Sequence, residues 1–105
     1  MQDLAIPIDK DKLRDFCHKW KITEFALFGS VVRPEDFRDD SDVDVLVRVG
    51  PDATLTFEAW LDMREELKEM FGRDVDLAER VAVEQMRNYL RRAAILETAV
   101  FLDVA

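Results

Sequence analysis

Carboxylates gather in two short segments that otherwise have the pattern of β-strands. Asp42 and Asp44 begin one of these segments, and Asp74 and Asp76 lie within the other. Aspartate is among the residues least suited to a strand. Because side chains two residues apart in a strand project from the same face, each pair should point in one direction. If the two strands are neighbours, about 4.8 Å apart, the carboxylates converge on one small region.

Such a cluster of like charges is costly, and a bound cation would relieve the repulsion. Hard oxygen ligands suit Mg²⁺, which keeps several waters and takes its remaining ligands from phosphate groups. Two Mg²⁺ ions held in this way can clamp the attacking and leaving oxygens of a phosphoryl transfer. The residue types therefore predict metal-assisted phosphoryl chemistry. The alternative, a set of hydrated aspartates at strand ends, stays open above all for Asp74.

Gly29-Ser30 is a second candidate, for binding phosphate. Glycine lets the backbone approach a phosphate closely, and the following amides and hydroxyl can hold its oxygens. A turn glycine followed by a helix-capping serine would give the same two residues, so the pair alone decides nothing. No Gly-Lys-Ser/Thr follows, as a Walker loop requires, and the flanking glycine of a hydrolase nucleophile elbow is missing.

A calcium loop is excluded by the residues that follow the aspartates. Asp40-x-Asp42-x-Asp44 resembles the start of an EF-hand. The EF-hand requires a glycine at position 6 and a glutamate at position 12, where this sequence has Val45 and Pro51. The aspartates therefore need another explanation.

The single cysteine and single histidine exclude several other sites. Cys17 and His18 have no companions at zinc-ligand spacing, which excludes a structural zinc site and the usual Cys-His or Ser-His catalytic pair. One cysteine cannot form an internal disulfide framework and suits a reducing compartment. We expect Cys17 to be buried in helix packing. We also expect a cytoplasmic protein, because no segment resembles a signal peptide or reaches the ~18 apolar residues of a membrane span.

Length and charge narrow the classes further. The chain has 105 residues and a net charge of −8. This length predicts a single domain over residues 1–105. Direct nucleic-acid contact needs clustered Lys and Arg, so the acidic balance speaks against it. A nucleotide substrate remains compatible, because bound Mg²⁺ can reverse the local sign of the charge.

The elements that must position these residues follow from hydrophobic periodicity. Helices are predicted over 9–20, 55–71 and 83–97. Strands are predicted over 25–28, 42–49 and 74–78, and residues 100–102 are a candidate edge strand. Asp9 should cap the first helix, and Gly72 should end the second. The order of elements predicts an α/β (α+β) fold in which helices cover a mixed sheet.

The segments that carry chemistry together resemble the signature of the polymerase-β-type nucleotidyltransferase superfamily. That signature is a Gly-Ser, a spacer, an Asp-x-Asp on a strand and a third Asp on a later strand. The matching segments are Phe28-Gly29-Ser30, Arg33, Ser41-Asp42-Val43-Asp44 and Val75-Asp76-Leu77. The small size resembles the minimal nucleotidyltransferases, which include the MntA antitoxins paired with HEPN-type ribonuclease toxins. The resemblance runs from about residue 12 to the C-terminus, and only the combined pattern is specific.

The resemblance implies a nucleotidyltransferase-like fold and roles for the carboxylates. Asp42 and Asp44 would be catalytic metal ligands for two Mg²⁺ ions. Asp76 would be a further metal ligand or the base that takes the proton of the acceptor hydroxyl. Asp74 has no regular counterpart in the family.

The remaining motif residues would bind the nucleotide. The resemblance implies that Gly29 and Ser30 contact the outgoing phosphates of ATP, with Arg33 and Ser41 completing the nucleotide-binding set. The family spacer between the serine and the first aspartate is usually ten residues, and residues 31–41 exceed it by one. We therefore expect a bulge in the loop over residues 34–40.

The activity implied is Mg²⁺-dependent transfer of AMP from ATP to a protein hydroxyl. By resemblance, the acceptor is a tyrosine of a cognate HEPN ribonuclease toxin, which the chain silences as its antitoxin. One alternative is a non-catalytic antitoxin that binds its toxin through a helix face carrying Tyr89, Arg91 and Arg92. Another is nucleotidyl transfer to a small molecule or RNA.

Overall fold

Four strands form one mixed sheet in the computed structural model, which describes residues 4, 6–51, 53 and 55–103. The strands are β1 (Ile22–Phe28), β2 (Val43–Val49), β3 (Val75–Glu79) and β4 (Val100–Leu102). Their order across the sheet is β3-β2-β1-β4. β1 is antiparallel to both β2 and β4, whereas β2 and β3 are parallel. The predicted mixed sheet and the edge strand over 100–102 are confirmed.

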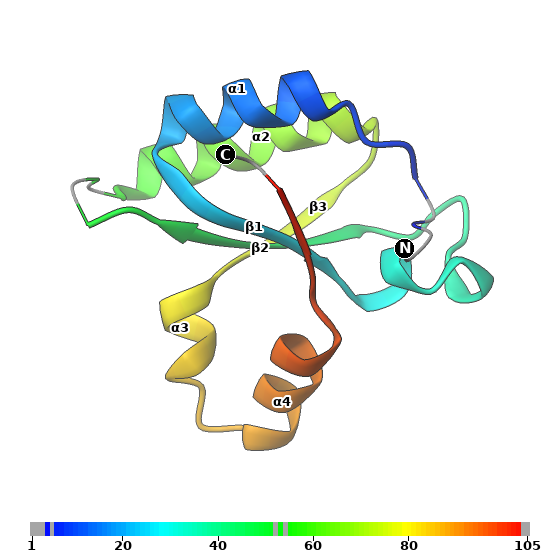
Figure 1. The fold of residues 1–105 in the computed structure, drawn as a ribbon. Helices are drawn as coiled ribbons and strands as arrows, with labels where there is room; N and C mark the ends of the chain where they lie inside the picture. Colours follow the sequence, from blue (N-terminus) through cyan, green and yellow to red (C-terminus); the bar gives the residue numbers. More distant parts are fainter. Residues whose placement is uncertain (1–3, 5, 52, 54, 104–105) are drawn as a thin grey trace.

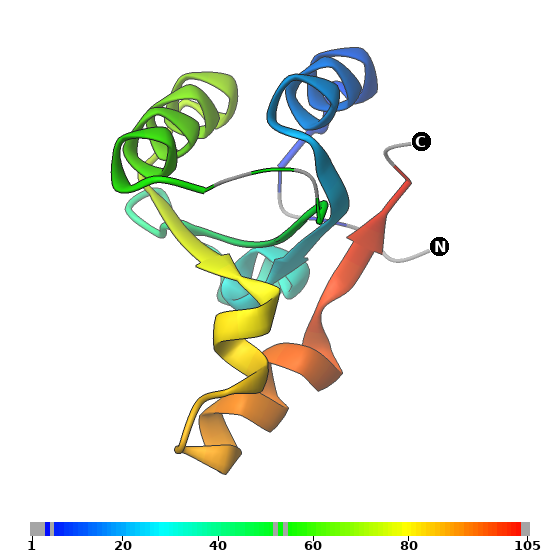
Figure 2. The same cartoon turned by 90° about the vertical axis from the view of Figure 1, so that its left-hand side faces the viewer.

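Helices cover both faces of the sheet (Figure 1). The helices α1 (Lys10–Trp20) and α2 (Phe57–Phe71) lie on one face. The shorter helices α3 (Arg80–Glu84) and α4 (Tyr89–Thr98) lie on the other, as the rotated view in Figure 2 also shows. No helix in the described part of the chain has the length and apolar character needed to cross a membrane.

Alternation along the strands divides the core between the two faces. Val43, Val45 and Val47 point toward α1 and α2 and are fully buried there. The opposite face is smaller, and its buried side chains are Ala26, Phe28, Leu46, Val83 and Ile95. Each fully buried aliphatic side chain contributes about 1.5–3 kcal/mol. By the same alternation, Asp44 must emerge on the face covered by α3 and α4.

The start of α1 and the end of α2 form as predicted, although α2 begins at Phe57 after a cap at Thr56, two residues later than the predicted helix over 55–71. The Asp9 carboxylate accepts hydrogen bonds from the backbone N–H groups of Asp11 and Lys12, at 3.1 and 3.2 Å. Such a cap is worth about 1 kcal/mol. Gly72 ends α2 in the left-handed conformation, with φ at 68°. A left-handed backbone costs glycine little, because glycine has no Cβ atom.

The prediction of one continuous helix over 83–97 is wrong, because the structure has two helices separated by residues 85–88. The Asn88 side chain accepts a hydrogen bond from the N–H of Arg91 at 3.1 Å and thereby starts α4. Glu79 caps α3 in the same way, through the N–H of Ala82 at 2.9 Å. Asparagine competes with a continuing helix by bonding to nearby backbone, so Asn88 marks a start where we predicted a helix interior.

β1 begins three residues earlier than the predicted strand over 25–28. The added segment contains the charged residue Glu24, which the apolar pattern did not favour. Glu24 forms ion pairs with Arg48 of β2 and with Arg80 of α3. Contacts with other elements therefore extend the strand beyond its apolar run.

Candidate active site

The register of the sheet places Asp44 and Asp76 side by side. They are Cα partners on the parallel strands β2 and β3. Both strands begin close to these residues, so both carboxylates lie near the same end of the sheet. β2 starts at Val43 rather than at Asp42, which directly precedes it. The condition for convergence of the carboxylates, that the two strands are neighbours, is met.

The negative charges of Asp42 and Asp76 act on Asp44. Burial, followed by the negative charges of Asp76 and Asp42, raises the pKa of Asp44 to about 6. The positive charges of Arg91 and Arg33 act in the opposite direction. Asp44 is therefore a half-buried carboxylate that lacks enough positive charge around it, and a cation would favour its ionised form.

The donor set fits Mg²⁺ better than a metal held by protein groups alone. Among the described residues, no three Asp, Glu, His or Cys side chains are gathered closely enough to form a complete site. Mg²⁺ is usually held by one or two carboxylates plus substrate phosphates and water, so neighbouring Asp44 and Asp76 fit its needs. The assignment of Asp42, Asp44 and Asp76 as metal ligands stays a prediction.

Gly29 brings the Gly-Ser turn against the carboxylates. Its φ is +72°, in the left-handed region, and the preceding Phe28 is the Cα partner of Asp44. A Cβ atom added to Gly29 would collide with Oδ2 of Asp44 and lie 3.1 Å from its Cγ. The position therefore needs glycine both for its backbone conformation and for the close approach of Asp44. Of the two interpretations of the Gly-Ser pair, this contact favours a functional turn.

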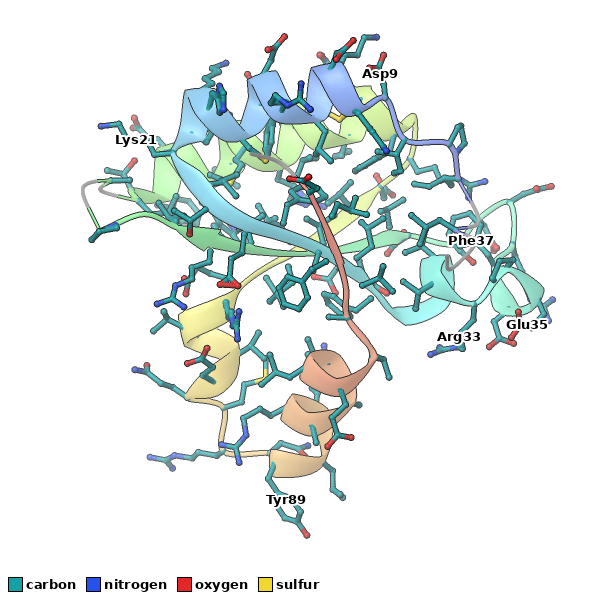
Figure 3. The ribbon with its side chains drawn as sticks, viewed as in Figure 1. Asp9, Lys21, Arg33, Glu35, Phe37 and Tyr89 are labelled. Carbon is teal, nitrogen blue, oxygen red and sulfur yellow. The ribbon has the colours of Figure 1, made fainter. Side chains whose placement is uncertain are left out.

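Two short 3-10 turns follow β1, η1 (Gly29–Val32) and η2 (Pro34–Asp36). Ser30 lies in η1, and Arg33 joins the two turns. The carbonyl oxygen of Ser30 accepts a hydrogen bond from the N–H of Arg33 at 3.0 Å. Arg33 is exposed, as Figure 3 shows, and its Nε donates to Asp36 at 2.8 Å. The residues 34–40, where we expected a bulge, form η2 and a further turn.

The loop before Asp42 is held by an arginine that the sequence analysis missed. Nη1 of Arg73 donates to the carbonyl oxygens of Arg38, Asp39 and Ser41, at 2.9, 3.0 and 3.2 Å. Its guanidinium also lies 4.3 Å from the centre of the Phe37 ring. No local pattern reveals this role, because the three carbonyls become neighbours of Arg73 only in the folded chain.

Ser41, predicted to bind the nucleotide, makes a structural contact. Its hydroxyl oxygen accepts a hydrogen bond from the N–H of Arg38 at 2.9 Å, which closes the turn before Asp42. The hydroxyl therefore helps to position the carboxylate-bearing loop. Its predicted contact with the nucleotide stays a prediction.

Asp74 does not join the carboxylate cluster. It precedes β3, and its carboxylate lies 3.4 Å from Nζ of Lys68 in α2. Its carbonyl oxygen accepts a hydrogen bond from the N–H of Val43 at 2.9 Å, which helps to align β2 with β3. The expectation that Asp74 points with Asp76 is wrong, because the strand begins one residue after Asp74.

Arg91 is a second residue whose place the sequence analysis missed. It lines a cavity of about 280 Å³ together with Asp76. The positive charge of Arg91 acts on Asp44. Arg91 therefore lies near the carboxylates, whereas the sequence predicted only that it could contact a partner protein. A larger hollow of about 490 Å³ lies between α1 and α2, on the opposite face of the sheet. Because neither Asp44 nor Asp76 lines that hollow, the smaller cavity is the one that belongs to the site.

Comparisons with known proteins show the family of this chain. The model of the nucleotidyltransferase domain family matches residues 10–101. A protein of Methanocaldococcus jannaschii named "putative protein adenylyltransferase" is 32% identical over 84 residues, which are 80% of each chain. A solved structure described as a "putative minimal nucleotidyltransferase" is 26% identical, has a TM-score of 0.68, and covers 89% of this chain and 88% of that one.

Two more distant structures share the fold. A toxin-antitoxin complex with AMP-PNP gives a TM-score of 0.67 at 20% identity, over 93% of this chain and 75% of that one. An MNT antitoxin in complex with the tri-AMPylated HEPN toxin of Shewanella oneidensis gives 0.53 at 18% identity, over 92% and 74%. The chain therefore belongs to the nucleotidyltransferase domain family and is an enzyme of that class.

Proposed function

We propose that this enzyme transfers AMP from Mg²⁺-bound ATP to a hydroxyl group of a partner protein. The observation that carries the proposal is the contact of Gly29 with Asp44, beside Asp76 on the next strand. A turn that can receive phosphates and a pair of carboxylates that favours a cation thus lie against each other. Phosphoryl transfer needs these two parts in one place.

In the proposed reaction, positioning and electrostatics contribute most of the catalysis. Gly29 and Ser30 receive the outgoing phosphates, and Asp42, Asp44 and Asp76 would hold Mg²⁺. When bound, Mg²⁺ would neutralise the triphosphate and the pyrophosphate that leaves. The acceptor hydroxyl attacks the α-phosphorus in line with the leaving oxygen.

We further propose that the partner is a HEPN ribonuclease toxin, that the acceptor is one of its tyrosines, and that the enzyme is the antitoxin. Support comes from the relatives. One carries the name of a protein adenylyltransferase, and two similar structures are toxin-antitoxin complexes, one of them with an AMPylated HEPN toxin. The net charge of −8 is compatible with covering a ribonuclease whose surface must hold RNA.

The test is to incubate the enzyme, its toxin and Mg²⁺-ATP and to measure the mass of the toxin. We expect a gain of one or more AMP groups, which Asp42→Asn/Asp44→Asn abolishes. Asp74→Asn is the matched control, because Asp74 is an exposed aspartate paired with Lys68 outside the cluster. An unchanged toxin mass, or an equal gain with the double variant, would refute the proposal.

Neutralisation by binding alone is the second candidate. Tyr89 and Leu90 are 64% and 69% exposed at the start of α4, and Tyr89 points away from the sheet (Figure 3). Arg92, by contrast, is turned inward to the carbonyl oxygens of Glu84 and Met86. Full protection by Asp42→Asn/Asp44→Asn in cells, without AMP on the toxin, would favour binding over catalysis.

A further inference from the structure

We propose that the cavity between β3, α3 and α4 is the acceptor subsite of this enzyme and takes the phenol ring of a tyrosine side chain. Arg91, at the same cavity, would bind the α-phosphate that the phenol attacks. The inference rests on the proposed function and adds to it the place where the acceptor binds and a residue that contacts the reacting group.

The cavity has mostly apolar walls, and two of its charged lining residues can take part in the proposed reaction. Its volume is about 280 Å³, and Leu77, Val83, Met86 and Ile95 are among its apolar lining residues. Asp76 and Arg91 also line it. The third charged lining residue, Glu79, is already engaged as the N-cap of α3. A phenol matches this lining, because its ring is apolar and its hydroxyl is polar.

The size of the cavity favours a single ring over a whole nucleotide. Pockets that enclose a drug-sized ligand measure roughly 300–1,000 Å³, and this cavity lies just below that range. A nucleotide bound at Gly29 and Asp44 would therefore lie mostly outside the cavity. The volume of the cavity matches one aromatic side chain of a partner better than a whole nucleotide.

The position of Asp76 indicates that the cavity binds the acceptor rather than the adenine ring of ATP. The attacking oxygen must come within roughly 3–3.5 Å of the α-phosphorus. The adenine is separated from that phosphorus by the ribose. Asp76 forms part of the cavity wall and is the Cα partner of Asp44, so a hydroxyl at this wall lies next to the carboxylates. A base bound there would instead occupy the place that the nucleophile needs.

Arg91 is available for phosphate in a way that nearby arginines are not. Arg33 is paired with Asp36, and Arg80 with Glu24. Across the described residues, the Arg91 guanidinium has no hydrogen bond or ion pair, while its backbone N–H is fixed by Asn88 at 3.1 Å. Its charge nevertheless reaches Asp44. A guanidinium can donate two parallel hydrogen bonds to phosphate oxygens, so the α-phosphate would supply the missing partner.

In the proposed transfer of AMP to the phenol, one bond to the α-phosphorus forms as another breaks. The phenol oxygen forms a bond to the α-phosphorus as the bond from that phosphorus to the oxygen bridging to the β-phosphorus breaks. The bridging oxygen leaves with pyrophosphate, and the phenol proton passes to the carboxylate oxygen of Asp76 that would not be bound to Mg²⁺. Arg91 holds the non-bridging oxygens of the α-phosphate, where negative charge must be stabilised in the transition state.

Binding to the cavity can be tested without transfer. The full chain is labelled at Ala, Val and Met methyl groups and saturated with Mg²⁺ and α,β-methylene-ATP, which cannot transfer AMP. N-acetyltyrosinamide and adenosine are then titrated separately. We expect the tyrosine probe to shift the methyl signals of Ala82, Val83 and Met86, and adenosine to leave them unchanged. A response to adenosine instead, or to neither probe, would overturn the inference.

The same titration separates this inference from the proposed function. If α,β-methylene-ATP fails to bind the wild-type chain, the proposed function fails, and the inference fails with it. If the nucleotide binds and the tyrosine probe does not occupy the cavity, only the acceptor subsite is overturned.

Two pairs of variants extend the test to transfer. Ala82→Phe fills the cavity, whereas Ala94→Phe places the same ring on an exposed position of α4 outside it. With the toxin as acceptor, Ala82→Phe should lower kcat/KM for the toxin by roughly tenfold or more, whether through a higher KM or a lower kcat. The KM for ATP should be nearly unchanged. Ala94→Phe should behave as wild type. Equal effects of the two variants would contradict the inference.

For the arginine, Arg91→Met is compared with Arg87→Met, which removes a charge from an exposed position outside the cavity. We expect Arg91→Met to lower kcat by roughly 10²-fold, as for a lost donor to a transition-state oxyanion. Arg91→Lys should recover part of this loss, because it keeps the charge without the forked geometry. Wild-type kcat in Arg91→Met, with the fold intact by circular dichroism, would contradict the role of Arg91.

Discussion

At the scale of single residues, the fold disfavours the ionised form of Asp44, which is the form that the proposed function needs. Its pKa is raised from the ordinary 3.8 to about 6, chiefly by burial. A raised carboxyl pKa means that the folded state resists ionisation. The stability associated with the protonated form is fully present below pH 4 and is lost as the pH rises through 6. At neutral pH the ionised Asp44 therefore lowers the stability of the metal-free protein.

Asp44→Asn should stabilise the metal-free protein at pH 7. The gain should be about 1 kcal/mol once solvent screening of this half-buried group is discounted, and it should shrink toward pH 4. Urea unfolding in EDTA at both pH values measures it. Asp74→Asn, which removes an exposed and ion-paired carboxylate, should give no such gain. An equal effect of Asp44→Asn at the two pH values would contradict the assigned cause.

Two glycines allow a matched test of the Gly-Ser turn. Gly29 and Gly72 both have positive φ, at 72° and 68°, but only Gly29 has a neighbour where a Cβ would stand. Gly72→Ala should cost about 1–2 kcal/mol of stability through its backbone and leave activity intact. Gly29→Ala should also displace the Asp44 carboxylate and remove most transfer activity. Unfolding and transfer assays on both variants decide this; comparable activities would contradict the claimed contact.

Single residues also show where sequence reasoning succeeds and fails. The sequence predicts that carboxylates of the two strands converge if the strands are neighbours, and the register places Asp44 beside Asp76. The roles of these residues as metal ligands stay a prediction. Arg91 was interpreted as part of a basic edge facing a partner. Its contact with the site depends on α4 folding back against the sheet, which no local spacing predicts.

At the scale of elements, the strands and the loop between them decide where the carboxylates lie. The alternating pattern of β2 was enough to predict its faces, since one face is buried valine. The prediction of one helix over 83–97 failed because a cap at Asn88 outweighs the apolar periodicity on either side. The conformation of the loop before Asp42 could not be predicted, because Arg73 binds backbone carbonyl oxygens there. Every residue has a backbone carbonyl group, so these contacts leave no pattern in the sequence.

Arg73→Lys should loosen that loop without unfolding the protein. Lysine has no forked donor, so it cannot serve the three carbonyl oxygens that Arg73 contacts. We expect the Mg²⁺ concentration for half-maximal activity to rise roughly tenfold, as for the loss of about 1.4 kcal/mol of positioning. Arg48→Lys, at an exposed position of β2, is the control. A change in melting temperature with an unchanged Mg²⁺ requirement would show a structural role alone.

At the scale of the whole molecule, the sheet separates a large core from a smaller, chemically active face. α1 and α2 pack against one face of the sheet, and α3 and α4 against the other (Figures 1 and 2). The cavity lies beside α3 and α4, and Trp60 of α2 also lines it. Asp44 and Asp76 lie on paired strands that pack on both faces, so rigid elements hold these two carboxylates, whereas Gly29, Ser30 and Asp42 lie in connecting segments. Rigid elements hold catalytic groups more accurately than loops do.

Cys17 reports on the integrity of the larger core. It is 1% exposed, and burial raises the pKa of its thiol to about 12. Since the thiolate is the reactive form, a thiol reagent at pH 8 should react with the native protein only when the protein unfolds. We expect very slow labelling in buffer and complete labelling in denaturing urea. Rapid labelling of the native protein would show that α1 does not pack as described.

The central claim is that Asp44 and Asp76 form a place where a divalent cation allows ATP to bind. Calorimetric titration of the wild-type chain with α,β-methylene-ATP, in Mg²⁺ and in EDTA, tests it most directly. We expect binding in Mg²⁺, none in EDTA, and none with Asp44→Asn/Asp76→Asn in either condition. Nucleotide binding of equal strength in EDTA, or undiminished binding by the double variant, would contradict it.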